Sequence, residues 1–117
     1  MPENCIFCKI VAGEIPASVV YEDDSVIAIR DINPQAPVHL LVIPREHVAG
    51  LSNLDEEHVE MAGRALLAAR RVAETQDELA AGFRLIVNNG EAAGQTVAHL
   101  HLHILGGRRF SEGMVPG

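Results

Sequence analysis

Residues 99–105 read HLHLHIL, and this strict alternation constrains the fold more than any other part of the 117-residue chain. Successive side chains of a β-strand point to opposite faces, so the pattern predicts a strand over Ala98–Leu105. Leucine and isoleucine would occupy one face of that strand and could pack on a hydrophobic core. The opposite face would carry three histidines: His99, His101 and His103.

The spacing of these histidines bears on what they can do. Alternate residues of a strand lie roughly 6.5–7 Å apart, whereas imidazole nitrogens bind zinc at about 2.0–2.1 Å. Sharing one ion is therefore difficult, but the rings can line a groove in which each has a separate task. Imidazole can act as nucleophile, proton donor or metal ligand near neutral pH. A solvated polar face is the structural alternative, and the strict alternation favours function.

The remaining pattern predicts one α+β domain over residues 1–117. Short hairpin-type connections favour a mostly antiparallel five-stranded sheet, covered by one long helix and preceded by a short N-terminal helix. The expected elements are a short helix in CIFCKIVAG, a hairpin of Ser18–Glu22 and Ser25–Arg30, strands Val38–Pro44, Phe83–Asn88 and Ala98–Leu105, and a long helix from Asp55 to about Leu79.

The long helix has recognisable end signals and an apolar stripe. Asp55 is expected to cap its N-terminus and Gly82 to end it. His58, in its first turn, is expected to be solvated. The apolar residues that recur at spacings of three and four, and are therefore expected to face the core, are Val59, Ala62, Leu66, Ala69 and Ala73.

Composition excludes some classes of protein. A net charge of −7 with nine Lys+Arg lacks the basic surface of a nucleic-acid binder. No apolar run is long enough to span a membrane, and the N-terminus does not read as a signal peptide, so a cytoplasmic location is expected. Cys5 and Cys8 would then be thiols or metal ligands rather than a disulfide.

Several segments in register resemble the histidine triad (HIT) family. HLHLHIL matches its motif of three histidines separated by hydrophobic residues, and the likeness extends from CIFCKI and EIPA through DINPQAPVHLLVIP to NNGEAAGQTVAHLHLHILGGR. The continuation LGGR (Leu105–Arg108) is more similar to the Hint-like, nucleotide-binding branch than to the diadenosine-polyphosphate hydrolases. The resemblance implies a HIT-like fold and a homodimer packed through the long helix and a sheet edge.

The resemblance also implies a mechanism. His101 would attack the α-phosphorus of a purine nucleoside 5′-phosphate derivative and form a covalent nucleotidyl-histidine that water hydrolyses. The backbone carbonyl of His99 would hold its tautomer, His103 would donate to phosphate oxygens, and Thr96 would contact the leaving group. His39 matches a fourth family histidine, although a structural histidine on a neighbouring strand explains it equally well.

A larger set of positions matches the family's nucleotide site. Apolar residues would surround the base, Asp31 would accept hydrogen bonds from the ribose hydroxyls, and a glycine-containing loop would approach the phosphate. Thr96 stands where Hint proteins more often have serine, and Ile29 where relatives often have an aromatic ring. The positions are Ile6, Phe7, Ile10, Ile29, Asp31, Ile32, Asn88, Gly94, Gln95, Thr96, His101 and His103.

Cys5 and Cys8 form a CxxC pair with three interpretations. A redox motif would need a thioredoxin-like context, which is missing; two reduced thiols in a small helix, or half of a zinc site, remain. In similar family members a structural Zn²⁺ is held by two cysteines and two histidines. The matching ligands here are Cys5, Cys8, His47 and His99.

The expected function is therefore a purine nucleoside phosphoramidase or nucleotidyl hydrolase that releases a nucleoside 5′-monophosphate. It would need no catalytic cofactor, because the nucleophile is an imidazole. Hydrolysis of dinucleoside polyphosphates, nucleotide binding with incidental turnover and a purely structural zinc module are the alternatives. The tail Met114–Gly117 reads MVPG where many relatives end in Trp-Pro-Pro-Gly, so it offers no indole for substrate choice.

Overall fold

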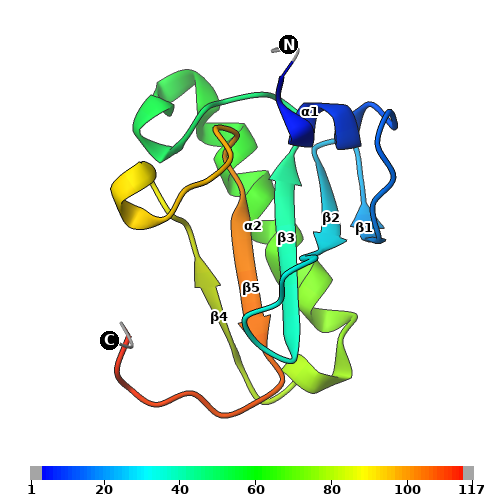
Figure 1. Ribbon diagram of the computed structural model, residues 1–117, viewed down its shortest axis with the longest axis vertical. Helices are drawn as coiled ribbons and strands as arrows, with labels where there is room; N and C mark the ends of the chain where they lie inside the picture. Colours follow the sequence, from blue (N-terminus) through cyan, green and yellow to red (C-terminus); the bar gives the residue numbers. More distant parts are fainter. Residues whose placement is uncertain (1–3, 115–117) are drawn as a thin grey trace.

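The structure, a computed structural model that describes residues 4–114, is built around a five-stranded antiparallel sheet (Figure 1). The strands lie in the order β1-β2-β3-β5-β4, as the predicted α+β architecture requires. Of the tail Met114–Gly117, only Met114 belongs to the described residues, so the expectation for the tail is not tested. The elements are α1 Ile6–Val11, β1 Val19–Glu22, β2 Val26–Arg30, β3 Val38–Pro44, η1 Leu51–Asn53, η2 Glu56–His58, α2 Val59–Glu74, η3 Asp77–Leu79, β4 Phe83–Ile86, η4 Glu91–Ala93 and β5 Leu102–Gly106.

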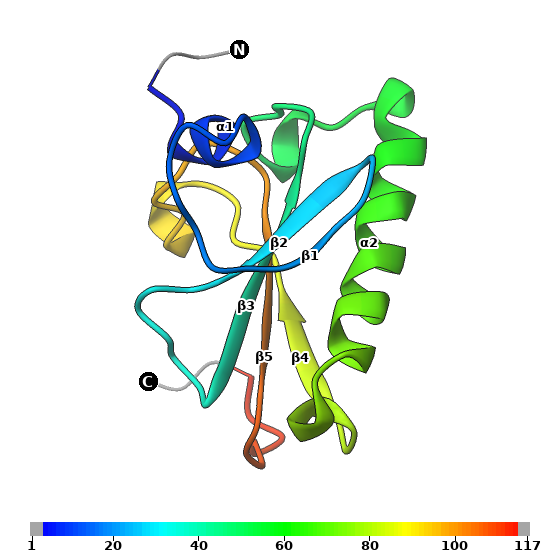
Figure 2. The ribbon, with the colours of Figure 1, turned by 90° about the vertical axis from the view of Figure 1, so that its right-hand side faces the viewer.

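The two faces of the sheet carry different layers. Figure 2 shows α2 on one side of the sheet and α1 with η4 on the other. On β3 all seven residues are buried, and alternate side chains serve the two faces. Leu40 and Val42 belong to the core under α2, whereas Leu41 and Ile43 belong to a second core under α1. The triad histidines lie on this second face, where Phe7 of α1 contacts the rings of His99 and His101.

The long helix is shorter than its sequence pattern predicts. Asp55 does cap the start, since its side chain accepts a hydrogen bond from Glu57 N–H at 3.0 Å, but one 3-10 turn precedes α2. The helix ends at Glu74, and Gln76 is already extended. Gly82 therefore precedes β4 instead of ending the helix, and the predicted extension to Leu79 is wrong.

The buried face of α2 also differs from the predicted stripe. Ala69 and Ala73 face the core, but Val59 is 70% exposed and Leu66 is 56% exposed. Small side chains let the helix approach the sheet closely, which outweighs the larger apolar area that Val59 and Leu66 could bury. The buried helix residues are Ala65, Ala68, Ala69, Val72 and Ala73. His58 is buried as well, which corrects its predicted solvation.

The final strand begins at Leu102 instead of Ala98. The backbone before it makes other hydrogen bonds: His99 N–H donates to Val97 O at 2.9 Å and Leu100 N–H to Val48 O at 2.7 Å. Of the three triad histidines only His103 therefore lies on β5. The alternation predicted a regular strand, and the first two histidines are instead set on an irregular segment with contacts of their own.

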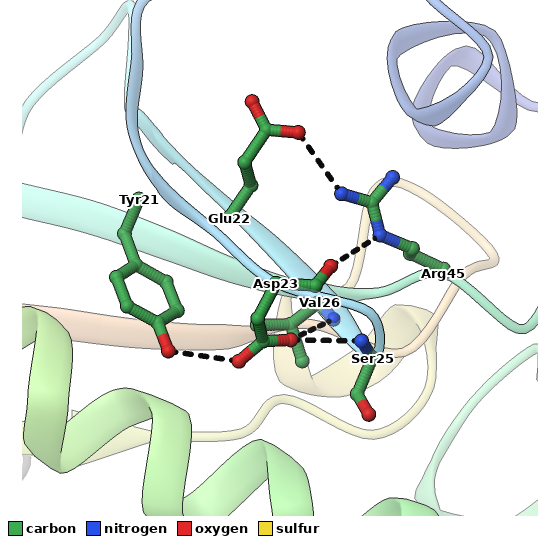
Figure 3. A network of polar contacts seen from close by, with 6 residues as sticks. All are labelled: Tyr21, Glu22, Asp23, Ser25, Val26 and Arg45. Atoms are coloured by element: carbon green, nitrogen blue, oxygen red, sulfur yellow. Dashed lines mark hydrogen bonds and ion pairs between the residues drawn. The ribbon is translucent and has the colours of Figure 1, made fainter.

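The turn between β1 and β2 holds the end of β3 in place (Figure 3). Asp23 accepts hydrogen bonds from the backbone N–H groups of Ser25 and Val26 and from the Tyr21 hydroxyl, all within 2.9 Å. Burial raises the pKa of this carboxyl, but these hydrogen bonds outweigh it and lower the pKa overall. The Asp23 carbonyl in turn accepts from Arg45 Nε at 2.7 Å, which fixes the chain that leads to His47.

Candidate active site and metal centre

Adjacent strands bring the histidines together from distant parts of the chain. His39 of β3 pairs with Leu105 of β5, and Leu41 pairs with His103. The rings of His39 and His103 are 5.2 Å apart, and those of His101 and His103 are 5.0 Å apart, both measured between centroids. The register thus forms a continuous row of three imidazoles on the face opposite α2.

The protonation pattern of His101 follows from one contact. Its Nδ1 lies 2.7 Å from the backbone carbonyl oxygen of His99. A carbonyl oxygen can only accept, so Nδ1 carries the hydrogen and Nε2 of the neutral ring has a free lone pair. Phe7 of α1 packs edge-on against this ring, with centroids 4.9 Å apart, and His101 is 7% exposed. The ring is therefore oriented as a nucleophile would need to be.

A chain of hydrogen bonds fixes the other two rings. Gln35 N–H donates to His39 Nδ1 at 3.0 Å, which places the His39 hydrogen on Nε2. That nitrogen lies 2.9 Å from His103 Nδ1 and 3.4 Å from Asp31 Oδ2. His103 Nδ1 therefore accepts, and its own hydrogen is on Nε2. This arrangement makes His103 Nε2–H a donor toward the groove.

His39 and His103 are neutral at physiological pH. Burial, reinforced by the neighbouring His101 and His39 rings, lowers the pKa of His103 to about 4, although Asp31 opposes the shift. Burial also lowers the pKa of His39, again with Asp31 acting in the opposite direction. When both rings are neutral, each carries one hydrogen and one lone pair, which is the state that the hydrogen-bond chain between them requires.

Acid is expected to destabilise the fold through His103. Its folded pKa of about 4 lies below the ordinary value of 6.5, so the unfolded chain binds this proton more readily and the free energy of unfolding falls as pH falls through that window. In His103→Asn the free energy of unfolding should decrease less over this pH range, by on the order of 1 kcal/mol after allowance for solvent screening. Urea denaturation of both proteins at several pH values across this window measures the difference. If the free energy of unfolding depended on pH identically in both, His103 would not be the group responsible.

The loop before the triad has the backbone geometry of a glycine turn. Gly90 and Gly94 both have φ near +90°, a conformation that other residues adopt only with strain. Gln95 closes the loop: its Oε1 accepts from Gly90 N–H at 2.8 Å and its Nε2 donates to Ala49 O at 2.8 Å. Thr96 is exposed beside it. Asn88 lies just before this loop, and a Cβ built on Gly94 would meet its Nδ2 at 4.0 Å.

The structure brings some of the predicted base-pocket residues together and leaves others apart. Phe7, Ile10 and Ile29 are buried in the second core. Ile6 is 44% exposed at its edge, and Ile32 is fully exposed in the loop after β2. Asp31 is in contact with the histidine row, since its Oδ2 lies 3.4 Å from His39 Nε2, and its Oδ1 accepts a hydrogen bond from Asn33 N–H at 2.8 Å.

A second cluster meets the requirements of a metal site. Cys5, Cys8, His47 and His99 offer ligand atoms that all lie within 4.8 Å of one another. His99 Nδ1 is 3.1 Å from His47 Nδ1, 3.3 Å from Cys5 Sγ and 3.5 Å from Cys8 Sγ. Ligands at about 2.0–2.3 Å from one tetrahedral ion would lie about 3.3–3.8 Å apart, so the Cys₂His₂ set fits zinc.

The second ring nitrogen of His99 forms a hydrogen bond of its own. Its Nε2 donates to the Pro44 carbonyl at 2.8 Å, so Nδ1 presents a lone pair to the cysteines. His99 is completely buried. The same residue thus offers its ring to the metal cluster and its carbonyl to His101, which joins the two sites through one residue.

Two contacts of the site had no signal in the sequence. The Gln35 N–H and the Pro44 carbonyl set the tautomers of His39 and His99, but backbone groups carry no residue identity. Phe7 was expected only as a base-pocket residue, and its contact with His101 depends on where α1 lies on the sheet.

Within residues 4–114 no helix has the length and apolar character needed to cross a membrane.

Comparison with known proteins agrees with this geometry. The family model of the HIT domain matches residues 12–110. The chain is 44% identical to the purine nucleoside phosphoramidase of Escherichia coli, covering 92% of this chain and 91% of the relative. It is 49% identical to the adenylylsulfatase HINT1 of Arabidopsis thaliana, covering 91% of this chain and 73% of the relative.

Two further likenesses bear on the metal cluster and the fold. A 14 kDa zinc-binding protein of Brassica juncea is 48% identical, over 92% of this chain and 96% of the relative. The solved structure of a HIT family hydrolase from Clostridium thermocellum superposes with a TM-score of 0.94 at 48% identity, over 98% of this chain and all of that one. This protein is a member of the HIT family.

Proposed function

We propose that the protein is a purine nucleoside phosphoramidase that works through a covalent nucleotidyl-histidine. The observation that carries this proposal is the 2.7 Å contact between His101 Nδ1 and the His99 carbonyl, because it leaves Nε2 free to attack. The 44% identical phosphoramidase of Escherichia coli supports the choice of substrate class.

The reaction has two displacements at one phosphorus. In the first, His101 Nε2 forms a bond to phosphorus, the P–N bond breaks, and the departing nitrogen takes a proton from water and leaves as the amine. In the second, water attacks the nucleotidyl-histidine, the N–P bond to His101 breaks, and the nucleoside monophosphate leaves. The net change is addition of water across the P–N bond, and the imidazole returns to its neutral state.

His103 and His39 have separate tasks in this scheme. His103 Nε2–H would donate to the phosphate oxygens, whose charge increases as the nucleophile attacks. His39 would keep that donor in place, because its Nε2–H points at His103 Nδ1 over 2.9 Å. Asp31 and the apolar residues under α1 would hold the ribose and base, and Asn88, Gly94, Gln95 and Thr96 the phosphate and leaving-group side.

Zinc would have a structural task. Cys5, Cys8, His47 and His99 would hold it, and the ion when bound supplies a closed crosslink, without Lewis-acid chemistry on the substrate. Through these four residues α1, the segment after β3 and the triad segment are joined near the top of the sheet in Figure 1. The position of the His99 carbonyl, and with it the orientation of His101, depends on that junction.

A comparison of leaving groups tests the proposed function. Purified protein should release AMP from adenosine 5′-phosphoramidate with a higher kcat/KM than from diadenosine polyphosphates or adenosine 5′-phosphosulfate. Chromatographic quantification of AMP gives the rates. A clear preference for the dinucleotide would favour the polyphosphate hydrolase, and a preference for the phosphosulfate would favour the activity named for the Arabidopsis relative.

We also propose that the protein forms a homodimer through α2 and β4. β4 is an edge strand with a row of apolar side chains that are more than a third exposed, and α2 adds three more. Large exposed apolar surface of this kind marks an interface. The residues concerned are Val59, Leu66, Leu67, Phe83, Leu85 and Ile86.

Sedimentation velocity is expected to give a mass twice the 12.6 kDa of one chain. Leu66→Lys places a charge within this surface and should shift the protein to the monomer. Val19→Lys is the matched control, since Val19 is 43% exposed on β1 at the opposite edge of the sheet, and should leave the dimer intact. A wild-type monomer at micromolar concentration would contradict the proposed interface.

A further inference from the structure

A cleft of about 720 Å³ opens between η1 and η4, next to the triad segment. One wall comes from the residues around η1, including Gly50 and Ser52, and the other from the glycine loop, including Asn89 and Glu91. Thr96 and Gln95 also line the cleft. Its volume falls in the range of small-molecule sites, and neither the base pocket nor the metal cluster accounts for it.

The position of the cleft relates it to the reaction. Figure 2 places α1 and η4 on the same side of the sheet, opposite α2, and in Figure 1 α1 lies near β2 and β3, whereas η4 lies toward the β4 edge. The residues proposed to hold the base lie under α1. A nucleotide with its base there and its phosphate at the histidine row would leave the η4 side of this face for its leaving group. Thr96, proposed to contact the leaving group, forms part of the cleft wall.

Asn89 and Gln95, two of the three amide side chains that line the cleft, form hydrogen bonds within the protein itself. Asn89 Oδ1 accepts from Ser52 N–H at 3.0 Å and Asn89 Nδ2 donates to Ser52 Oγ at 2.7 Å. Both ends of the Gln95 amide are likewise bonded to backbone groups. These contacts hold the two walls at a fixed separation.

The charge of the lining distinguishes between ligands that carry opposite charges. Glu91 is the one charged residue among those lining the cleft, and no cation lines it. Its side chain is exposed, and none of the ion pairs formed within residues 4–114 involves it. An anionic group in the cleft would meet an uncompensated carboxylate, whereas a cationic group would find a partner.

We infer that this cleft receives the leaving group and that Glu91 makes the enzyme selective for amines that carry a positive charge. The inference rests on the proposed phosphoramidase function and narrows its substrate class to phosphoramidates of cationic amines. Sulfate, phosphate and carboxylate-bearing leaving groups are disfavoured by the same carboxylate. Glu91 acts on binding of the departing amine and takes no part in bond formation at phosphorus.

Three series of adenosine phosphoramidates test the inference. Their amines have two to six carbons and end in an ammonium, a methyl or a carboxylate group, so that charge changes at similar length. At one or more lengths wild-type protein should show the order ammonium, methyl, carboxylate in kcat/KM, with neighbouring members differing about two- to fivefold, as expected for one exposed charge. Added salt should reduce the differences.

Substitutions of Glu91 test whether this residue is responsible for the preference for ammonium end groups. Glu91→Gln should remove most of the preference for ammonium over methyl, and Glu91→Lys should reverse it. Glu78→Gln changes net charge equally at an exposed position outside the cleft and should keep the wild-type ratios. Equal rates for all three end groups at every length, or unchanged ratios in both Glu91 variants, would overturn the inference. Absence of AMP release from the parent adenosine phosphoramidate would overturn the proposed function itself.

Discussion

His101→Ala should reduce AMP release from adenosine 5′-phosphoramidate by at least about 10³-fold, because it removes the proposed nucleophile and leaves no neighbouring group placed to replace it. His103 cannot substitute, since its Nδ1 faces His39 and its Nε2 carries the hydrogen. AMP should still bind with a Kd within about threefold of wild type, because base and ribose contacts remain. Single-turnover kinetics and calorimetric AMP binding measure the two effects separately.

Loss of fold is a competing explanation for an inactive variant, and a matched control addresses it. His58 is buried to a similar extent, 9% exposed against 7% for His101, and lies at the start of α2 away from the groove. His58→Ala should therefore retain turnover per folded molecule. If His101→Ala kept substantial turnover while AMP binding was intact, the nucleophile would have to be another group.

The second large effect is expected at the metal cluster. Cys5→Ser replaces a proposed thiolate ligand by a hydroxyl that binds zinc poorly, so zinc content should fall well below one ion per chain. Because zinc binds the folded site, its loss should lower the free energy of unfolding by more than about 3 kcal/mol. Cys5 also caps α1 by accepting from Cys8 N–H at 3.3 Å, and serine can keep that contact. Nucleotide affinity should change about threefold or less.

Removal of zinc with a chelator distinguishes the effect of losing the metal from the effect of changing the Cys5 side chain. Wild-type protein stripped of zinc should match Cys5→Ser in urea denaturation, and re-addition of zinc should restore only the wild type. Protein purified without chelators that contains no zinc, yet has the stability of zinc-supplemented protein, would contradict the metal assignment.

The sequence predicts the architecture well because the strands are strongly patterned. Val38–Pro44 is uniformly apolar apart from His39, and the structure makes it the fully buried β3 of the sheet. The hairpin of β1 and β2 follows from two β-rich runs around an acidic turn. These features depend on local preference and burial, which a single sequence carries.

Predictions that depend on tertiary packing were less accurate. On α2 the larger apolar residues suggested a core face, but close packing on the sheet selects alanines and leaves Leu66 exposed. The regular strand expected from Ala98 fails because Leu100 N–H bonds to the loop carbonyl of Val48. The tautomers of His39 and His99 depend on backbone atoms 4 and 55 residues away in sequence, which no residue pattern reveals.

The central claim is that His101 becomes covalently attached to the nucleotide, and trapping of the intermediate tests it most directly. The protein is mixed with a slowly hydrolysed adenosine phosphoramidate, quenched, digested and analysed by mass spectrometry. The account predicts an adenylyl group on the peptide that contains HLHLHIL, with fragmentation placing it on His101. A label on any other residue would contradict the account.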